Sequence, residues 1–476
     1  MLQSEALSIL NAGANVFLTG APGAGKTYVL NEFVHAARSA GKSVAVTAST
    51  GIASTHINGQ TIHSWSGVGV STYLDDVVLK RIRTRRRKAL KAADVLVIDE
   101  ISMLHAWLFD MVDVVCRTLR DDDRPFGGLQ VVISGDFFQL PPVSVSGRNN
   151  DVINPSEAFL RSREEYARRG LNPEGFVTES LVWERLNPAV CYLTEQHRQD
   201  DGQLLAVLTD IRKGAVSEQD CELLDARIGA EPEAHMVATH LFPTNRQADS
   251  LNNSRLAQLP GAERTYHAEA SGSAQLVERL KKNMLAPEHL VLKQGAAVMA
   301  LRNDQDHQYV NGSIGTVRDF TPETKGGWPI VEFENGNIVT MKPVSWEMMD
   351  GETVLAAVNQ VPLRCAWAIT IHKSQGMTLD RAVMDLRRTF APGMGYVALS
   401  RVERLGGLYL RGINNRAFLV SSDAIALDSR LRDESQAACA VLAEEGTEGF
   451  RHGRLRQTAG DGEVHADDEF SQGELF

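Results

Sequence analysis

This sequence lacks long apolar runs, paired cysteines and any excess of basic charge. No run of about 18 apolar residues occurs, so we expect no membrane-spanning helix. The five cysteines are scattered and include no C-x-x-C pair, which argues against a disulfide framework and against a zinc or iron–sulfur centre. The first ten residues have neither a basic n-region nor a transit-peptide character, so we expect a cytoplasmic protein.

The formal net charge of -11 is unfavourable for nucleic-acid binding, but the charge is unevenly distributed. The segment from Glu444 to Phe476 alone carries nine acids against three arginines, which is more than half of the imbalance. A local basic groove could therefore still bind nucleic acid. Within 67–91, the run Arg81 to Lys88 is strongly basic and reads equally well as a solvated helix face or as an arm that contacts phosphates.

Length and apolar patterning predict an α/β protein of several domains. A chain of 476 residues suggests about three domains at ~150 residues each. Continuous apolar runs separated by helical stretches indicate a parallel sheet that is buried on both faces. In the first core we expect strands at Val16–Thr19, Val44–Thr47, Val95–Asp99 and Val131–Gly135.

A second core is expected from later apolar runs at Val190–Leu193, Met236–Phe242, Cys365–Thr370 and Val383–Leu386. Brief strands at 296–301, 314–320, 330–334 and 338–341, with the hairpin signal Asn335-Gly336, predict a small all-β barrel inserted into this core. The expected divisions are 1–143 for the first core, 144–185 for a polar insertion or linker, 186–260 and 354–441 for the second core, 261–353 for the β-rich insertion, and 442–476 for a disordered acidic tail.

The most informative motif is G-A-P-G-A-G-K-T, which follows the apolar run Val16–Leu18 and precedes a helical segment. A strand, a glycine loop and a helix N-terminus surround a triphosphate with backbone N–H groups, whereas the alternative is a plain glycine-rich turn. Lys26 is expected to reach the β- and γ-phosphates of ATP, and the Thr27 hydroxyl to hold Mg²⁺. The cofactor-binding residues expected from the motif are Gly20, Ala21, Pro22, Gly23, Ala24, Gly25, Lys26 and Thr27.

Two further polar groups follow apolar strands. Asp99 and Glu100 end the run Val95–Ile98, where the first acid would bind Mg²⁺ and the second would orient or deprotonate the attacking water. Such a pair could instead cap a helix. Gln139 follows the next strand and would touch the γ-phosphate, although a loop amide that bonds the backbone is the alternative.

Eight ordered motifs resemble those of superfamily 1 helicases, and most closely the petite integration frequency (PIF-type) family, with Dda-like and RecD-like enzymes as neighbours. They are G-A-P-G-A-G-K-T, T-A-S-T-G-I-A-S, V-I-D-E-I-S-M-L, P-F-G-G-L-Q, G-D-F-F-Q-L-P-P-V, L-T-E-Q-H-R-Q, A-I-T-I-H-K-S-Q-G-M-T-L-D and Y-V-A-L-S-R-V. The resemblance spans about 3–414. It implies two RecA-like domains with an SH3-like insertion, and an ATP-dependent 5′→3′ helicase on single-stranded DNA that acts in replication, repair or recombination.

The same resemblance implies roles for individual residues. Gln3 would read the adenine, Arg198 and Arg401 would reach the γ-phosphate and act with Lys26, Glu100 and Gln139 in catalysis, and Gly376 would lie near the nucleotide. Since two arginines supplied from another domain act only on closure, hydrolysis would be linked to domain motion. The expected DNA contacts are Thr47, Ser49, Thr50, His63, Trp65, His372 and Ser374. Trp65 could equally be a core residue.

The C-terminal residues suggest a partner other than DNA. Gln472, Leu475 and Phe476 stand in a sequence that resembles a bacterial sliding-clamp-binding peptide, although an accidental tail sequence is the alternative. Together with the resemblance, this places the expected protein at the bacterial nucleoid, as a monomer. Two rival functions remain open at this level: an ATPase that remodels proteins, and a clamp-tethered recruitment factor whose ATPase is only a switch.

Overall fold

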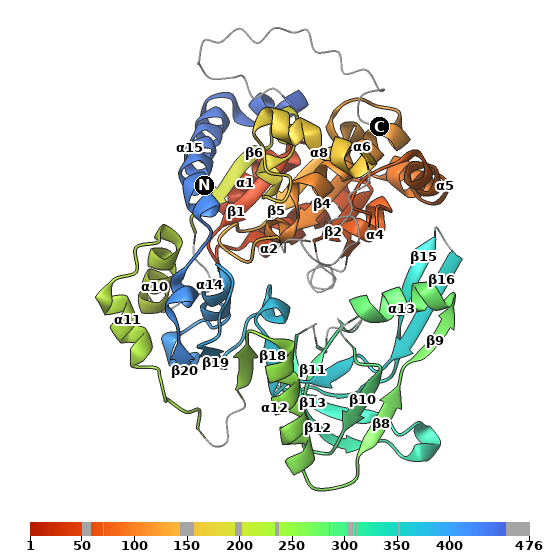
Figure 1. Cartoon of the computed structure of the whole chain (residues 1–476), viewed down its shortest axis with the longest axis vertical. Coiled ribbons are helices and arrows are strands. Elements are labelled where there is room, and N and C mark those ends of the chain that lie inside the picture. Colours follow the sequence, from red (N-terminus) through yellow and green to blue (C-terminus); the bar gives the residue numbers. More distant parts are fainter. Residues whose placement is uncertain are drawn as a thin grey trace. The chain divides into compact units, whose positions relative to one another are not determined.

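The computed structural model describes residues 1–49, 59–69, 71–142, 157–195, 202–233, 238–284, 286–302, 304, 306, 308–309, 312–350 and 353–453 (Figure 1). The chain divides into two compact units. The first unit comprises 1–50, 60–198 and 422–476, and the second comprises 51–59 and 199–421. No helix within the described ranges is long and apolar enough to cross a membrane.

The first unit is built on a six-stranded, all-parallel sheet in the order β3-β2-β4-β5-β1-β6. Strands β1, β4 and β5 are made of the apolar runs expected from the sequence, and their burial matches a sheet covered on both faces. The strands are β1 (Val16–Gly20), β2 (Val44–Ala48), β3 (Gln60–Thr61), β4 (Val95–Asp99), β5 (Gln130–Ser134) and β6 (Ala189–Leu193).

Helices and short 3₁₀ turns surround this sheet. Helix α2 packs on β1 and β2, and α1 packs on α2. The helices are α1 (Gln3–Asn11), α2 (Lys26–Ser39), α4 (Ile62–Ser66), α5 (Asp76–Ala92), α6 (Ala106–Arg120), α8 (Glu157–Arg169), α9 (Trp183–Leu186) and α15 (Ser422–Glu445). The 3₁₀ turns are η1 (Ile101–Met103), η2 (Pro125–Gly128), η3 (Val177–Glu179) and η8 (Gly446–Gly453).

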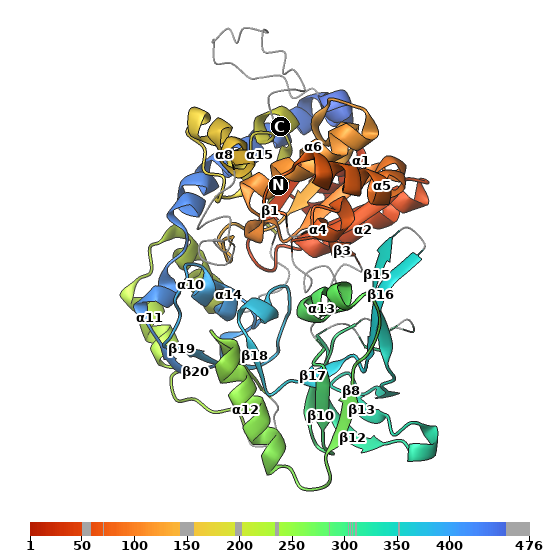
Figure 2. The same ribbon diagram turned by 45° about the vertical axis from the view of Figure 1, so that its right-hand side comes forward.

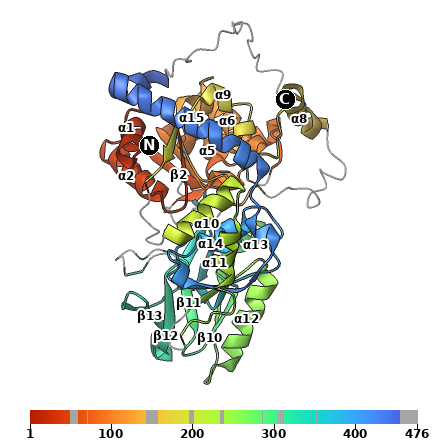
Figure 3. The same ribbon diagram turned by 90° about the vertical axis from the view of Figure 1, so that its left-hand side faces the viewer.

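Strand β6 corrects the expected start of the second core at residue 186. It pairs with β1 from Val16↔Ala189 to Gly20↔Leu193, so it belongs to the first sheet. Helix α15 packs on this edge strand and beside α1 (Figures 1 and 3), although the sequence places it in the second core. All buried parallel strands share one apolar pattern, so the pattern does not reveal to which sheet a strand belongs.

Two other expected divisions also change. Part of the expected linker forms helix α8, whose Tyr166 hydroxyl donates to Asp110 of α6. Asp110 also accepts the backbone N–H groups of Leu181 (2.8 Å) and Val182 (2.9 Å), which fixes this segment to the first unit. The expected disordered tail begins too early, because α15 and η8 continue to residue 453 and the ring of Phe450 is buried.

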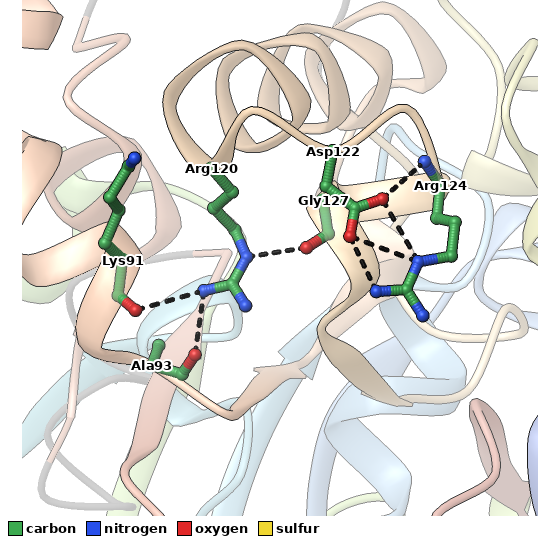
Figure 4. A network of polar contacts seen from close by, with 6 residues as sticks. All are labelled: Lys91, Ala93, Arg120, Asp122, Arg124 and Gly127. Carbon is green, nitrogen blue, oxygen red and sulfur yellow. Dashed lines mark hydrogen bonds and ion pairs between the residues drawn. The ribbon is translucent and has the colours of Figure 1, made fainter.

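The basic run at 81–88 lies in helix α5, which packs against α4 and α6. Arg120 at the end of α6 holds the C-terminus of α5 by donating to the carbonyls of Leu90 (2.7 Å) and Ala93 (2.8 Å). Figure 4 shows the contact with Ala93. The Arg120 Nε also donates to the carbonyl of Gly127 in η2 (2.6 Å). The basic run is therefore part of a helix that packs on the first unit and exposes its basic side chains to solvent. The 3₁₀ turn η2, which contains the P-F-G-G sequence, helps to hold this helix in place through Arg120.

The second unit contains a four-stranded parallel sheet in the order β18-β7-β19-β20. Three of its strands were expected, whereas β20 was not. The strands are β7 (Thr239–Phe242), β18 (Ala368–Thr370), β19 (Ala382–Leu386) and β20 (Leu408–Ile413). The helices are α10 (Gly202–Lys213), α11 (Glu218–Asp225), α12 (Asn245–Gln258) and α14 (Met394–Leu399), with the 3₁₀ turns η5 (His372–Ser374), η6 (Leu405–Gly407) and η7 (Asn415–Phe418).

The β-rich insertion is also present in the second unit, and it ends later than expected. It has a five-stranded antiparallel sheet, β14-β13-β12-β11-β17, whose last strand reaches Cys365 rather than stopping at residue 353. Asn335-Gly336 forms the expected hairpin turn between β13 and β14. Helix α13 packs on a second sheet, β15-β16-β9 (Figure 2). The elements are β8 (Arg264–His267), β9 (Glu269–Gly272), α13 (Ala274–Asn283), β10 (His289–Leu292), β11 (Ala297–Ala300), β12 (Ile314–Phe320), η4 (Glu323–Lys325), β13 (Pro329–Phe333), β14 (Ile338–Thr340), β15 (Val344–Asp350), β16 (Thr353–Gln360) and β17 (Leu363–Cys365).

Candidate active site

The glycine loop joins β1 to α2 in the first unit, as the sequence predicts. Gly23 and Gly25 both have φ of 84°, a left-handed conformation that glycine adopts without strain. Gly20 passes close to β6, since a Cβ there would lie 2.8 Å from the carbonyl oxygen of Leu193. The backbone amides at the start of α2 are thus arranged at a helix N-terminus, which favours a bound phosphate.

The side chains of the loop are placed for phosphate and cation binding. Lys26 Nζ donates to the carbonyls of Gly20 (2.8 Å) and Ala21 (3.2 Å), so its ammonium lies over the loop. Thr27 is exposed in the first turn of α2, while Pro22 is buried beneath the loop.

Gln3 lies against the same loop. Its Nε2 donates to the carbonyl of Ala24 (3.1 Å), and a Cβ on Gly25 would stand 2.1 Å from that nitrogen. The backbone N–H of Gln3 donates to Glu195 Oε2 (2.5 Å). Glu195 lies in the L-T-E-Q-H-R motif and was not expected in the site from the sequence, because a separation of 192 residues hides this positioning role.

Asp99 and Glu100 stand at the carboxyl end of β4. Burial raises the pKa of Asp99, against the lowering effects of the Glu100 N–H and of the Lys26 ammonium. Lys26 is therefore close enough to Asp99 for electrostatic attraction, which brings the two motifs together. Glu100 itself has φ of 51°, a left-handed conformation that is unfavourable for a residue with a Cβ and that is typical of functional sites.

Gln139 lies in the loop beyond β5, at the same edge of the sheet. Its backbone N–H donates to the carbonyl of Asp136 (3.0 Å), and Asp136 Oδ1 accepts the N–H of Phe138 (3.1 Å). Both Gln139 and Asp136 are buried. The sequence thus correctly places Gln139 at a strand end, and the structure adds the Asp136 turn that fixes its backbone.

These groups fit a magnesium nucleotide on structural grounds. The loop provides amides at a helix N-terminus and an ammonium, and the half-buried Asp99 carboxyl lies near that ammonium, with its pKa raised by desolvation. Carboxylate and hydroxyl oxygens are the ligands that Mg²⁺ prefers.

In the second unit, Arg401 is buried beside the I-H-K-S-Q-G-M motif. Its guanidinium donates to the carbonyls of Met377 (3.0 Å), Ser374 (3.2 Å) and Val397 (2.8 Å), and to Ser400 Oγ (2.8 Å). Gly376 is exposed with φ of 80°. Arg198 lies outside the described residues.

The expected DNA contacts divide by burial. Thr47, Trp65 and Ser374, three of the expected DNA contacts, are buried, with exposed fractions of 0%, 4% and 0%. Thr47 Oγ1 donates to the carbonyl of Val97 (2.7 Å), and Ser374 Oγ donates to that of Ile371 (2.8 Å), so both hydroxyls satisfy the local backbone.

The remaining expected DNA contacts differ in accessibility. Ser49 is buried and donates to the carbonyl of Glu100 (2.6 Å), which ties the end of β2 to the catalytic strand. His63 and His372 are half-buried at the sheet edges of the first and second units. Thr50 lies outside the described residues, as do Gln472, Leu475 and Phe476.

Comparisons with known proteins agree on one family. The PIF1-like helicase model matches residues 4–162, and the model of the DNA helicase Pif1 2B domain matches residues 275–320. The ATP-dependent DNA helicase Pif1 of Psychrobacter sp. is 38% identical over 92% of this chain and 72% of that protein.

Solved structures of the same family share the fold. The Pif1 helicase of Candida albicans has a TM-score of 0.76 and 31% identity, covering 90% of this chain and 98% of that one. The Pif1 helicase of Bacteroides in complex with ADP-AlF3 and ssDNA has a TM-score of 0.65 and 27% identity, covering 94% and 99%.

Proposed function

This chain belongs to the PIF1-like helicase family and is an ATP-dependent DNA helicase, and from that premise we propose that it moves 5′→3′ along single-stranded DNA. The direction of movement rests on the family resemblance, and the observation that carries ATP hydrolysis is the convergence of Gln3, Lys26 and Asp99 at one loop of the first unit. This arrangement supports the hydrolysis of ATP rather than of any other phosphate compound, since Gln3 is available to contact the adenine and the loop is available to bind the phosphates.

In the proposed reaction, the loop amides and Lys26 bind the phosphates while Glu100 accepts a proton from the attacking water. Gln139 orients the terminal phosphate from the end of β5. Thr27 and Asp99 would hold Mg²⁺, which would supply positive charge to the phosphate oxygens. Gln3 contacts the adenine, and Glu195 positions Gln3 through its backbone.

Movement on DNA requires that hydrolysis changes how the protein grips the strand. We propose two RecA-like units for this purpose, with an SH3-like barrel in the β-rich insertion. We propose that the nucleotide is contacted by Arg198, Arg401 and Gly376. Single-stranded DNA is proposed to be contacted by Ser49, Thr50, His63 and His372. Arg401 donates to the carbonyls of Ser374 and Met377, so it is anchored to the segment that begins two residues after His372.

The decisive experiment is strand displacement on duplexes with a 5′ or a 3′ single-stranded tail. We expect unwinding only from the 5′ tail, ATP turnover stimulated by single-stranded DNA, and loss of both with Lys26→Ala. Glu100→Gln should retain nucleotide binding while hydrolysis falls by about 100-fold or more. Unwinding from the 3′ tail alone would overturn the polarity, and unwinding by Lys26→Ala would overturn the mechanism.

A sliding clamp is a proposed second partner, through Gln472, Leu475 and Phe476. In this type of peptide a glutamine makes polar contacts and a Leu-Phe pair fills an apolar pocket. A pull-down of purified clamp with the wild-type chain and with the Leu475→Ala, Phe476→Ala double variant tests it. Recovery should fall in the variant, whereas equal recovery would end the proposal.

A further inference from the structure

One large aromatic ring of the second unit faces solvent at the ligand-binding edge of its sheet. Phe390 is 55% exposed and lies in the loop that follows β19. In open parallel α/β sheets, ligands bind beyond the carboxyl ends of the strands, which is where this loop stands. Its charged neighbours Arg387 and Arg388 are also exposed, so the ring is not part of a broad apolar patch.

The loop is built to hold this ring outward. Thr389 is buried and its hydroxyl bonds to Asn414 Oδ1, while Asn414 Nδ2 donates to the carbonyls of Arg387 (3.0 Å) and Thr389 (3.2 Å). A Cβ on Gly412 would lie 2.8 Å from Arg387 Cδ, so the absence of a side chain there leaves room for the loop. With Thr389 fixed inward, Arg388 and Phe390 on either side of it remain at the surface.

His372, which follows β18, stacks against the ring of Phe390. The two ring centroids are 6.4 Å apart with an interplanar angle of 23°, a stacked arrangement within the usual range for aromatic pairs. His372 follows β18 and Phe390 follows β19, and both strands pair with β7, so the ring pair spans the end of β7. Burial lowers the pKa of His372, which favours the neutral imidazole.

We propose that Phe390, supported by His372, stacks on a nucleobase of single-stranded DNA, with Arg388 placed to attract the phosphate backbone. This inference rests on the proposed movement along single-stranded DNA. Every base offers a flat π face, so an aromatic platform with an adjacent cation suits a strand that passes through regardless of its sequence. The stacking residue is absent from the DNA contacts expected from the motifs, because it lies between two of them.

The test compares Phe390→Ala with Phe390→Tyr, and with Leu419→Ala as a matched control. Leu419 is also in the second unit and is 54% exposed, so its removal changes surface apolar area without removing an aromatic ring. For Phe390→Ala we expect an about tenfold rise in the single-stranded DNA concentration that half-maximally stimulates ATP turnover. Phe390→Tyr and Leu419→Ala should behave as the wild type, with melting temperatures unchanged throughout.

Oligonucleotides with consecutive abasic sites separate base stacking from other effects. If Phe390 stacks on a base, abasic DNA should weaken wild-type binding and abolish the difference between wild type and Phe390→Ala. A tenfold deficit that persists on abasic DNA, or wild-type behaviour of Phe390→Ala on normal DNA, would overturn the inference. Failure of the underlying function would look different, since wild-type ATP turnover would then not respond to single-stranded DNA at all.

Discussion

Arg401 holds the carbonyl oxygen of Met377 with its Nη1 at 3.0 Å, deep in the second unit. The same nitrogen bonds the carbonyl of Ser374 (3.2 Å), so one guanidinium fixes both ends of the loop that contains Gly376. An arginine expected from its motif to act on phosphate therefore also serves as the internal support of a second motif. A substitution at Arg401 is therefore expected to change the stability of the protein as well as its ATP turnover.

Arg401→Lys should lower the free energy of unfolding by about 2 to 3 kcal/mol, because a lysine cannot reproduce the forked contacts and leaves buried carbonyls unpaired. Thermal melting without nucleotide measures this directly. Turnover per folded molecule should also fall if the arginine acts on phosphate. An unchanged melting temperature would contradict the structural role, and unchanged turnover at saturating ATP would contradict the catalytic one.

Gln3→Ala should raise the KM for ATP by about tenfold and leave kcat nearly unchanged, because the proposed contact of Gln3 is with the adenine, which does not react. Steady-state kinetics with ATP and GTP provide the measurement. Discrimination between the two nucleotides should weaken. A drop in kcat with no change in KM would show instead that Gln3 supports the phosphate loop through Ala24.

Asp99→Asn should stabilise the nucleotide-free protein while abolishing hydrolysis. Burial raises the folded-state pKa of Asp99, so its charged form opposes folding above the unfolded-state pKa, and this penalty disappears as pH falls. The melting temperature of the variant should therefore exceed that of the wild type at neutral pH, and the gap should narrow in acid. A melting temperature below that of the wild type at neutral pH would contradict the prediction that the Asp99 charge destabilises the folded protein.

Arg120→Ala should destabilise the first unit by about 3 kcal/mol, since the carbonyls of Leu90, Ala93 and Gly127 would lose a charged donor. Figure 4 shows the contacts with Ala93 and Gly127. Arg124→Ala is the control in the same figure, because the Arg124 side chain pairs with Asp122 and is largely exposed. Its melting temperature should not change measurably. Equal losses in both variants would argue against Arg120 as the anchor of α5.

Tyr166→Phe should destabilise the protein more at pH 8 than at pH 5. Burial raises the pKa of Asp110 from 3.8 to about 7, so wild-type stability falls as pH rises through that interval. The Tyr166 hydroxyl supports the charged carboxyl, and its loss should make this fall steeper. Melting curves at the two pH values measure the difference, and a pH-independent loss would contradict the assignment to Asp110.

Much of the first unit could be predicted because its signals are local. The glycine loop, Lys26 and the acids after β4 each follow an apolar strand directly, and parallel strands place their carboxyl ends at one edge. The positions of β6 and α15 could not be predicted, since β6 pairs with β1 from far along the chain and α15 returns to the first unit only after the whole of the second. The burial of Thr47 was not expected from the sequence, and that of Trp65 was left open, because a polar or aromatic residue gives the same local pattern whether it faces solvent or the core.

The sequence by itself determined the chemistry of this protein, because a phosphate loop requires particular residues at fixed spacing. It also determined the family, through eight motifs in order. Only the tertiary structure decided that Gln3 meets the loop with Glu195 behind it, that Arg401 supports the Ser374–Met377 segment, and that Phe390 stands beside His372. These pairings depend on contacts between residues far apart in the chain, and such contacts leave no local pattern in the sequence.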